Sequence, residues 1–475
     1  MKMTVKKIRF LEPGNLPYRK SIKNLYIYDK YIRTPSVGLL TLSTIVKNVL
    51  DDTLMYSESI SKIKWEDVLD ADIVFIGVFT FNATRGYELA AYVKEHSLAV
   101  VVMGGLHASM NYPEAVQHCD YVLLGEGDES ILDFIAACKS GCAIDFPGVA
   151  YLRDGELVNT GERMPPDTID TIPNRSLCYN YHKMAGHNTL WPQVHASRGC
   201  PHHCDYCAVV RHFGQKVRTR TPANVVEDIR QAIAFHDNRA IPRLTRILWI
   251  TDDNFFADRA WAISVLKAII ASGIKYSFSV QARYEVGFDD EMLDLMKKAG
   301  FFEVAMGIEF LEDKAFELYN KSSNRADIIR SVRNIQKHDL GVRGLFIVGA
   351  DNHTKGVGDR LADFVIEYNI KGALIQSMYF VPGTPVYEAN ESRLLHKNWA
   401  KYNGNVVHRP QNISPHDLQK EILYASAKIY SAKRLISVLF NWRFTDKMLF
   451  WGEYFWQKDV RSALKLELPN LSSNV

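Results

Sequence analysis

The chain has 475 residues, of which 47% are hydrophobic and 23% are charged, and its formal net charge is +3. This length leaves room for two domains and a tail, and the apolar content is ordinary for a globular protein. So small a net charge gives no reason to expect a nucleic-acid partner. Residues 1–7 include three lysines but no apolar stretch follows them, so we expect no signal peptide. No apolar run approaches the roughly 20 residues that a membrane-spanning helix needs.

Short apolar runs alternate with helical patterns through the first part of the chain. The runs predict buried parallel strands at Ile8–Leu11, Ile73–Val78, Val100–Met103 and Tyr121–Leu124. The helical patterns lie at about Gly38–Val49, Thr84–His96, Pro113–His118 and Glu129–Cys138. Such alternation predicts a doubly wound, Rossmann-like α/β domain, which we place at residues 1–145.

Polar and glycine-rich segments follow three of these strands, and another precedes the first helix. Their candidate binding residues are Pro35, Ser36, Gly38, Thr80, Phe81, Asn82, Gly104, Gly105, His107, Gly125, Glu126 and Gly127. Open α/β sheets bind ligands at the carboxyl ends of their strands, and glycines let the backbone approach a ligand closely. On these residues alone, a generic nucleotide-binding sheet remains an equally good interpretation.

A second alternating series follows a hairpin and a linker. We expect the hairpin at Val149–Leu157, turning at Asp154-Gly155, and the proline-rich linker at Met164–Tyr181; together they occupy residues 146–185. Further strands are predicted at Gln193–Ala196, Ile247–Thr251, Tyr276–Gln281, Glu303–Ile308, Gly344–Val348 and Leu374–Phe380. They favour a partial (β/α)6, TIM-like barrel over residues 186–390, with its active site at the carboxyl ends of the strands. A helical region is expected at residues 391–475.

The most specific motif is a loop at the start of this series. It places Cys200, Cys204 and Cys207 in a C-x3-C-x2-C spacing, and three such thiolates can hold three irons of a [4Fe–4S] cluster. The fourth iron then stays open for a small molecule, which by analogy with zinc indicates a catalytic site. A zinc site completed by His202 and His203 is the main rival, but no second ligand pair follows at zinc-finger spacing. The other cysteines are scattered, so we expect neither a disulfide framework nor an auxiliary cluster.

This spacing, with Tyr206 before the last cysteine, resembles the signature of the radical S-adenosylmethionine (SAM) superfamily. The resemblance implies that SAM binds the open iron and is cleaved to a 5′-deoxyadenosyl radical, which abstracts hydrogen from an unreactive carbon. It also implies an electron donor such as a flavodoxin or ferredoxin. The residues that it places around SAM are Tyr206, Asp252, Asp253, Asn254, Gln281, Arg283 and Glu309.

Each of these polar residues also has a structural interpretation. Asp252 and Asn254 could accept hydrogen bonds from the ammonium group of SAM, but Asp and Asn also cap helices well. Arg283 suits a bidentate contact with a carboxylate, and Glu309 could orient Arg283 or bind a SAM hydroxyl. An ordinary ion pair between these two is nearly as good an explanation.

The glycine loops of the first domain, taken with the cysteine loop, resemble a large radical SAM subfamily whose N-terminal domain binds cobalamin. The resemblance implies that the candidate loop residues named above bind this cofactor. Many cobalamin domains place a D-x-H-x-x-G histidine after the first strand as the lower cobalt ligand, but residues 11–17 contain no histidine. We therefore expect the lower face of cobalt to meet water or an apolar wall, and we expect His107 to form hydrogen bonds within its loop.

The activity that this resemblance implies is methyl transfer to an unactivated carbon, through a 5′-deoxyadenosyl radical and methylcobalamin. The substrate would be a small or lipid-like molecule, and an oxygen-sensitive cluster favours the reducing cytoplasm. A non-methylating cyclase or rearrangement enzyme is the first alternative, and a redox-sensing or binding protein that keeps a cluster is the second. For the aromatic tail Tyr430–Trp456, we favour docking on the barrel over covering a hydrophobic substrate or touching a membrane.

Overall fold

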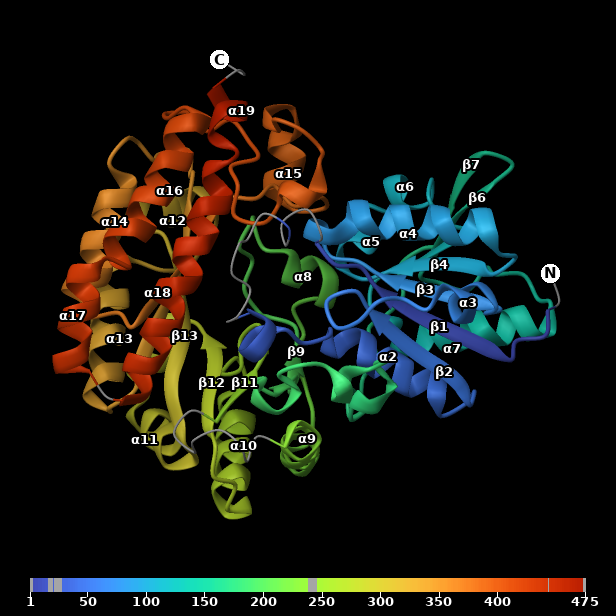
Figure 1. Ribbon diagram of the computed structural model, residues 1–475, viewed down its shortest axis with the longest axis horizontal. Helices are drawn as coiled ribbons and strands as arrows, with labels where there is room; N and C mark the ends of the chain where they lie inside the picture. Colours follow the sequence, from blue (N-terminus) through green and yellow to red (C-terminus); the bar gives the residue numbers. More distant parts are fainter. Residues whose placement is uncertain (1–2, 16–19, 21–27, 238–245, 443, 473–475) are drawn as a thin grey trace.

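Two large β-sheets with their flanking helices make up the chain (Figure 1). The computed structural model describes residues 3–15, 20, 28–237, 246–442 and 444–472. The first sheet and its helices lie on one side of the molecule, and the second sheet with the C-terminal helices lies on the other. The fold is therefore of the α/β class, as the alternating pattern predicts.

The N-terminal sheet has seven strands in the order β2-β1-β3-β4-β5-β6-β7. They are β1 (Lys7–Glu12), β2 (Asp52–Ser57), β3 (Ile73–Gly77), β4 (Val100–Gly104), β5 (Tyr121–Leu123), β6 (Val149–Arg153) and β7 (Glu156–Asn159). The first five are parallel, and their order 2-1-3-4-5 is that of a doubly wound sheet. Four of these strands match the predicted runs. The edge strand β2 was not predicted because half of its residues are polar, so it forms no continuous apolar run.

Helices cover both faces of this sheet because successive strand residues point to opposite sides. The helices are α2 (Val37–Lys47), α3 (Trp65–Leu69), α4 (Ala83–His96), α5 (Leu106–Met110), α6 (Tyr112–Ala115) and α7 (Gly127–Ser140). Ile73 and Phe75 of β3 are buried in the cluster that contains residues of α2 and α7. Val74 and Ile76 are buried with α4 on the other face. This alternation explains why the strands read as continuous apolar runs.

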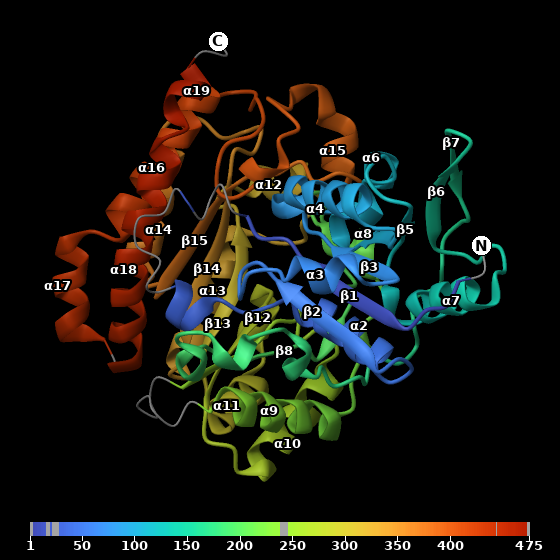
Figure 2. The ribbon, with the colours of Figure 1, turned by 45° about the vertical axis from the view of Figure 1, so that its right-hand side comes forward.

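The predicted hairpin is confirmed, and it forms the antiparallel edge β6–β7 of the N-terminal sheet (Figure 2). Asp154 and Gly155 both have positive φ, 53° and 84°, as a two-residue hairpin turn requires. The following proline-rich segment contains a short 3-10 turn, η3 (Arg175–Leu177), and pairs with β2 through an isolated bridge between Met55 and Cys178. The linker segment is thus packed against the N-terminal sheet.

The second sheet has six parallel strands in the order β15-β14-β13-β12-β11-β8. They are β8 (Gln193–Val194), β11 (Ile247–Ile250), β12 (Ser277–Ala282), β13 (Phe301–Glu309), β14 (Gly341–Val348) and β15 (Gly372–Ser377), and each overlaps a predicted strand. A two-stranded ribbon of β9 (Ser197–Arg198) and β10 (Arg218–Thr219) lies beside the cysteine loop. The helices are α8 (Ala208–Phe213), α9 (Pro222–His236), α10 (Arg259–Ser272), α11 (Asp290–Ala299), α12 (Asp313–Leu318), α13 (Arg325–Lys337), α14 (Val357–Glu367) and α15 (Pro385–Asn390).

The C-terminal segment joins the two halves of the molecule. Trp399 of the 3-10 turn η10 (Trp399–Lys401) and the adjacent Tyr402 are buried in the hydrophobic cluster of the N-terminal sheet. The last helices are α16 (Pro415–Ile429), α17 (Ala432–Asn441), α18 (Phe444–Lys465) and α19 (Leu468–Ser472). Helix α16 packs on α14, β15 and α18. Tyr430 is buried and accepts a hydrogen bond of 2.9 Å from the Ala373 N–H, so the start of the aromatic tail docks on the second sheet as expected.

None of the helices in the described part of the chain is both long enough and apolar enough to cross a membrane.

Candidate active site

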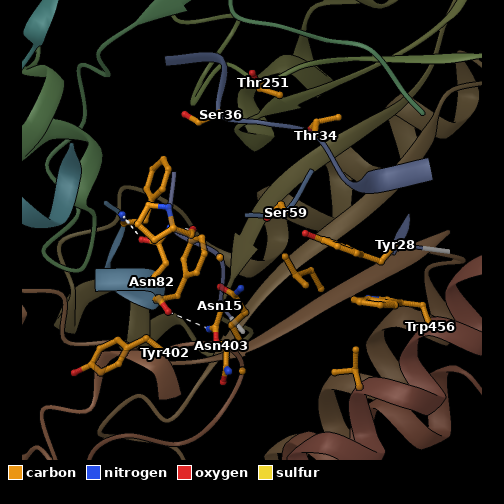
Figure 3. A pocket seen from close by; sticks show the side chains of 18 of the residues that line it. Asn15, Tyr28, Thr34, Ser36, Ser59, Asn82, Thr251, Tyr402, Asn403 and Trp456 are labelled. Carbon is orange, nitrogen blue, oxygen red and sulfur yellow. Dashed lines mark hydrogen bonds between the residues drawn. The ribbon is translucent and has the colours of Figure 1, made fainter. Parts of the chain in front are cut away.

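The carboxyl ends of both sheets open into one cavity of about 710 Å³ between the two halves of the chain. Loops after β1, β2 and β3 form one wall, and Gln193, His195, Thr251 and Asp253 from the second sheet form another. Figure 3 shows Asn15, Ser36 and Asn82 around this space. The volume lies in the range of cofactor and small-molecule sites, roughly 300–1,000 Å³. Both sheets thus present their usual ligand-binding edge to one cavity.

The loops of the N-terminal wall are held by hydrogen bonds between their own side chains and backbone. The predicted residues that line this cavity are Pro35, Ser36, Gly38, Phe81 and Asn82. Ser36 caps α2 by accepting from the Leu39 N–H at 3.4 Å. Asn82 accepts from the Phe79 N–H at 2.8 Å and donates to the Pro13 carbonyl at 2.8 Å, which ties the loops after β1 and β3 together. Their positions are therefore fixed before any ligand binds.

Glu12 is a cavity residue that the sequence analysis did not select. It ends β1, and one carboxylate oxygen accepts a 2.9 Å bond from the Ser36 N–H. Burial raises the pKa of Glu12 to about 7, which the hydrogen bond from the Ser36 N–H partly opposes. Its position directly after the predicted strand Ile8–Leu11 would have identified it by the rule applied to the other loops.

A second cavity of about 170 Å³ lies at the glycine loops of the same sheet. It is lined by the predicted residues Gly104, Gly105, Gly125, Glu126 and Gly127. It shares Ser36, Gly38, Phe79, His195 and Phe213 with the larger cavity, so the two are adjacent. Gly105 has φ +89°, and a Cβ there would lie 2.8 Å from the Val78 carbonyl oxygen. A side chain at position 105 would therefore collide with the backbone of Val78 in the wall of this cavity.

His195 borders both cavities and was also missed. Burial, with the nearby cations Arg198 and Arg220, lowers its pKa to about 3, so the imidazole is neutral. Its Nε2 is buried and has no hydrogen-bond partner among the described residues. His195 follows β8, and its position two residues before the Ser197–Cys207 loop was the available signal.

Two predicted residues, Thr80 and His107, line neither of these cavities. His107 is buried, and its ring nitrogens lie 3.3 Å from Thr80 Oγ1 and 3.1 Å from Tyr87 Oη. Glu114 lies 3.8 Å from His107 and accepts a 2.6 Å bond from the Trp399 indole. His107 therefore forms hydrogen bonds, as expected, but it does so in a polar cluster that joins α4, α5 and α6 to the C-terminal segment.

The side chain of Glu126 points to the cysteine loop. It forms ion pairs with Arg198, which lies two residues before Cys200, and with Arg218 of β10. Arg198 also pairs with Asp128 at 2.8 Å. Glu126, Arg198 and Arg218 are at most 9% exposed. We call these four residues the interdomain clamp, because they connect the loop after β5 to the ribbon β9–β10.

The three cysteines lie on one short loop and take no part in a disulfide bond. The loop closes through a 3.0 Å bond from the Cys207 N–H to the Cys204 carbonyl, and the Cys200 N–H donates to the Gly214 carbonyl at 3.3 Å. All three thiols are half-buried. Within the described ranges, no three His, Cys, Asp or Glu side chains converge on one point as the ligands of a single metal ion do. A [4Fe–4S] cluster needs no such convergence because each thiolate binds a different iron.

Tyr206 belongs to this loop, and its side chain packs against neighbouring aromatic rings. Its ring lies 5.8 Å from the ring of Phe310 and 6.4 Å from that of Tyr319, both centroid distances. Burial raises its pKa well above the ordinary value, so the hydroxyl stays protonated. Tyr206 thus fixes the cysteine loop against the carboxyl end of β13.

The three polar residues after β11 differ in environment. Asp252 is fully buried and accepts 2.6 Å bonds from the Ala196 N–H and the Ser197 hydroxyl, so it positions the segment before the cysteine loop. Asp253 lines the large cavity, and burial raises its pKa to about 6. Asn254 is buried and lines neither cavity. None of the three is the N-cap of α10, which is Asp258.

The interpretation that Glu309 orients Arg283 is wrong. Arg283 pairs with Glu285 at 2.9 Å and donates to the Ser322 carbonyl at 2.7 Å, whereas Glu309 pairs with the buried Lys321. Lys321 also donates to the Gly307 carbonyl at 2.9 Å. Both partners were missed because they lie outside the strand ends. Gln281 is exposed, and neither it nor Arg283 or Glu309 lines either cavity.

Glu309 also has a backbone conformation that is rare for a side-chain-bearing residue. Its φ is +58°, and the pairing of β13 with β14 shifts register between Gly307 and Glu309. Such strain persists only where surrounding contacts hold it, and it clusters at functional sites. The Lys321 pair supplies such a contact.

A family model matches part of the second α/β half of the chain, and the alignments with whole proteins also include much of the first α/β half. A sequence model described as the radical SAM superfamily matches residues 194–365. Bacteriochlorophyllide d C-12(1)-methyltransferase of Chlorobaculum tepidum is 24% identical over 427 residues, which cover 87% of this chain and 89% of that protein. Anaerobic magnesium-protoporphyrin IX monomethyl ester cyclase of Cereibacter sphaeroides is 24% identical over 388 residues, 76% of this chain and 61% of that one.

A solved structure shares the whole fold. The radical SAM methyltransferase TsrM of Kitasatospora setae, determined with cobalamin and a [4Fe–4S] cluster bound, superposes with a TM-score of 0.68 at 14% identity. The match covers 97% of this chain and 99% of that one. The arrangement of the two α/β halves is therefore one that a known protein also has.

Proposed function

We propose that this chain is a cobalamin-dependent radical SAM methyltransferase, on the premise that the radical SAM superfamily model matches residues 194–365. In this proposal it transfers a methyl group to an unactivated carbon of a small or lipid-like substrate. One observation carries the proposal: the ligand-binding edges of both sheets open into the same cavity. A cofactor held by the first sheet would therefore face a radical generated at the second. The methyltransferases among its relatives support the same reaction.

The residues present fit both cofactors. In this proposal Cys200, Cys204 and Cys207 hold the cluster, since they are free thiols on one closed loop. The glycine loops around Gly105 would hold cobalamin, because their backbone leaves a narrow space at the sheet edge. When bound, the cluster supplies the electron that cleaves SAM, and cobalamin supplies the methyl group.

The protein's own contribution is to position and enclose these groups. Asp252 and Tyr206 hold the cysteine loop from two sides, and the interdomain clamp fixes it relative to the glycine loops. Asp253 is the acidic residue of the second sheet that faces the cavity. In the proposal, Asp253 accepts a hydrogen bond from the ammonium group of SAM. Binding contacts with the rest of SAM are proposed for four residues at or near the strand ends: Asn254, Gln281, Arg283 and Glu309.

The finer architecture follows from the same proposal. Residues 1–145 would be the cobalamin domain, 146–185 the hairpin and linker, 186–390 the partial barrel and 391–475 the C-terminal region. A flavodoxin or ferredoxin would reduce the cluster, and the cytoplasm is the compartment that keeps such a cluster intact.

The test is an anaerobic reconstitution followed by a product assay. After reconstitution with iron, sulfide and hydroxocobalamin, and removal of the excess, we expect about four irons per chain and one cobalamin, read from absorbance. SAM cleavage upon reduction would exclude the redox-sensing alternative. A product heavier than the substrate by CH2 identifies methyl transfer, whereas ring closure or rearrangement, the reaction class favoured by the cyclase relative, adds no carbon. Four irons without cobalamin would overturn the methyltransferase proposal.

A further inference from the structure

One end of the large cavity is formed by the C-terminal helices and has no role in the proposal above. Helix α18 presents Trp456, Gln457, Val460, Arg461 and Leu464 to it, positions that recur at helical spacing and so form one face. Ile422, Leu423 and Ser426 of α16 and residues 374–376 of β15 complete this end. Figure 3 shows Trp456 beside Tyr28, and their rings are stacked with centroids 6.1 Å apart. We call this part the helical chamber; most of its lining is apolar.

Arg461 is the one arginine or lysine among the described residues that line the large cavity. Its Nη1 donates 3.1 Å bonds to the carbonyl and hydroxyl oxygens of Ser426. Among the described residues, Nε and Nη2 have no hydrogen-bond partner, and no carboxylate forms an ion pair with the guanidinium. Of the described residues, the three acidic ones that line the cavity do not pair with Arg461: Glu12 binds the Ser36 N–H, Glu58 pairs with Arg85, and Asp253 follows β11 on the wall formed by the second sheet.

Other buried and half-buried arginines of this chain show what the half-buried Arg461 lacks. Arg9, Arg175, Arg198, Arg218, Arg220 and Arg343 each pair with at least one carboxylate. Arg434 in the same C-terminal region has no carboxylate partner among the described residues. It instead donates to the carbonyls of Ile370 and Ile429 and lies over the rings of Trp442 and Phe450. Arg461 alone in this comparison keeps an unused pair of donors in the wall of a cavity.

The neighbour of Arg461 adds another donor. Gln457 uses its Oε1 to accept a 3.2 Å bond from the Ser426 hydroxyl, so its amide nitrogen remains for a ligand. Burial lowers the pKa of Arg461 from its ordinary value, which nearby Tyr454 and Tyr430 oppose, and the guanidinium nevertheless stays charged. A partly desolvated cation without a counter-ion is costly, and an anion at this point would remove that cost.

We propose that the helical chamber binds an otherwise apolar substrate by its anionic group, a carboxylate or a phosphate, and that Arg461 recognises this group. The guanidinium fork matches both anions in a bidentate contact. The apolar residues of α16, α18 and β15 would enclose the rest of the molecule, whose other end would extend toward the cofactor edges of the sheets. This inference rests on the proposed function, because it names the substrate class of the same cavity.

The test measures anion preference in the full-length, reconstituted enzyme. Anaerobic equilibrium dialysis would compare 1-pyrenebutyrate, 4-(1-pyrenyl)butyl phosphate and the uncharged 1-pyrenebutanol, which share one apolar body. We expect the wild type to bind the better anion at least about tenfold more tightly than the alcohol, as a charge-assisted contact allows. The Arg461→Gln variant should reduce that preference to less than about twofold while leaving affinity for the alcohol unchanged. Arg461→Lys should lie between them because lysine keeps the charge but not the fork.

A matched control removes a charge from the same helix outside the cavity. Lys458 is exposed on α18 and does not line the cavity, so Lys458→Gln should keep the wild-type preference. Equal Tm values and cobalamin contents of the variants show that folding is unaffected. An anion preference that survives Arg461→Gln, or a wild type without preference, overturns the inference. Cobalamin content, measured on the same samples, reports separately on the proposed function, so the two failures are distinguishable.

Discussion

The two sheet edges that face the large cavity are built from different kinds of residues. The N-terminal edge presents glycines and neutral polar groups, and its acidic residues are already engaged: Glu126 and Asp128 by arginines, Glu58 by Arg85 and Glu12 by the Ser36 N–H. The edge of the second sheet carries thiols and charged side chains with perturbed pKa values, such as Asp253. The first edge is therefore suited to hold a large ligand by shape and backbone contacts. The second is suited to metal and charge chemistry.

Removing one thiol of the cysteine loop should have the largest effect, because it takes away one of the three proposed iron ligands at the edge of the second sheet. Cys204→Ala leaves two of the three proposed iron ligands, and we expect the chain to lose its cluster and all SAM cleavage. Iron content and the cluster absorbance after anaerobic reconstitution measure this directly. The control is Cys142→Ala, which removes an exposed thiol outside the loop. If Cys204→Ala kept about four irons, the cluster assignment would be wrong.

The interdomain clamp tests whether the two edges depend on each other. Glu126→Gln leaves Arg218 buried without a carboxylate partner, and breaking a buried pair costs roughly 3 kcal/mol of stability. Chemical denaturation measures this loss. The cysteine loop should also lose its alignment with the glycine loops, which a changed electron paramagnetic resonance spectrum of the reduced cluster would report.

A surface pair of the same residue types supplies the control for the clamp. Glu129 pairs with Arg163 at 3.0 Å and its side chain is 58% exposed, so Glu129→Gln should cost less than about 1 kcal/mol. Equal losses for the two variants would show that the clamp is an ordinary surface interaction.

The glycine edge should respond to shape rather than to charge. Gly105→Ala places a Cβ 2.8 Å from the Val78 carbonyl in a left-handed backbone conformation, which costs roughly 1–3 kcal/mol. We expect a lower Tm and loss of cobalamin retention, with iron content unchanged. Gly155→Ala in the hairpin has the same kind of φ, +84°, with nothing within 4 Å. That control should lose some stability and keep cobalamin; loss of cobalamin in both would contradict a local role of Gly105.

The smallest effect is expected from the buried carboxyl group of Glu12. Its folded-state pKa is about 7, above the ordinary 4.5, because burial disfavours the charge. Between these values the folded chain binds more protons than the unfolded chain, so stability falls as pH rises. Glu12→Gln removes this titration, and its Tm relative to the wild type should be higher at pH 8 than at pH 5. The difference corresponds to roughly 2–3 kcal/mol, and a difference that does not change with pH would contradict the assignment.

Local patterns in the sequence predicted most of the strands and the cysteine loop. The strands of both sheets are buried apolar runs, and burial on two faces produces such runs wherever the sheet lies. The cysteine spacing is equally local, because eight consecutive residues carry all three thiols. The glycines of the N-terminal edge could be selected because they follow these strands.

The partners of the charged side chains could not be predicted in the same way. Glu309 pairs with Lys321, Arg283 with Glu285, and Glu126 with Arg198 and Arg218. For Glu309 and Glu126 the choice depends on which groups the fold brings within a few ångströms in a desolvated interior, where an unpaired charge is costly. Glu285 is instead 44% exposed and lies two residues after Arg283. His107 likewise satisfies its ring nitrogens with Thr80 and Tyr87 instead of lining a cavity.

The sequence by itself determined the fold class, the cysteine loop and the edge of each sheet that faces the cavities, because these follow from periodicity and from spacing along the chain. Only the tertiary structure decided that the two edges share one cavity and that α16 and α18 close it with Arg461 in its wall. The physical reason is that a cavity is made of surfaces from segments far apart in the sequence. The packing of the whole molecule brings these segments together, and a local sequence pattern does not predict that packing.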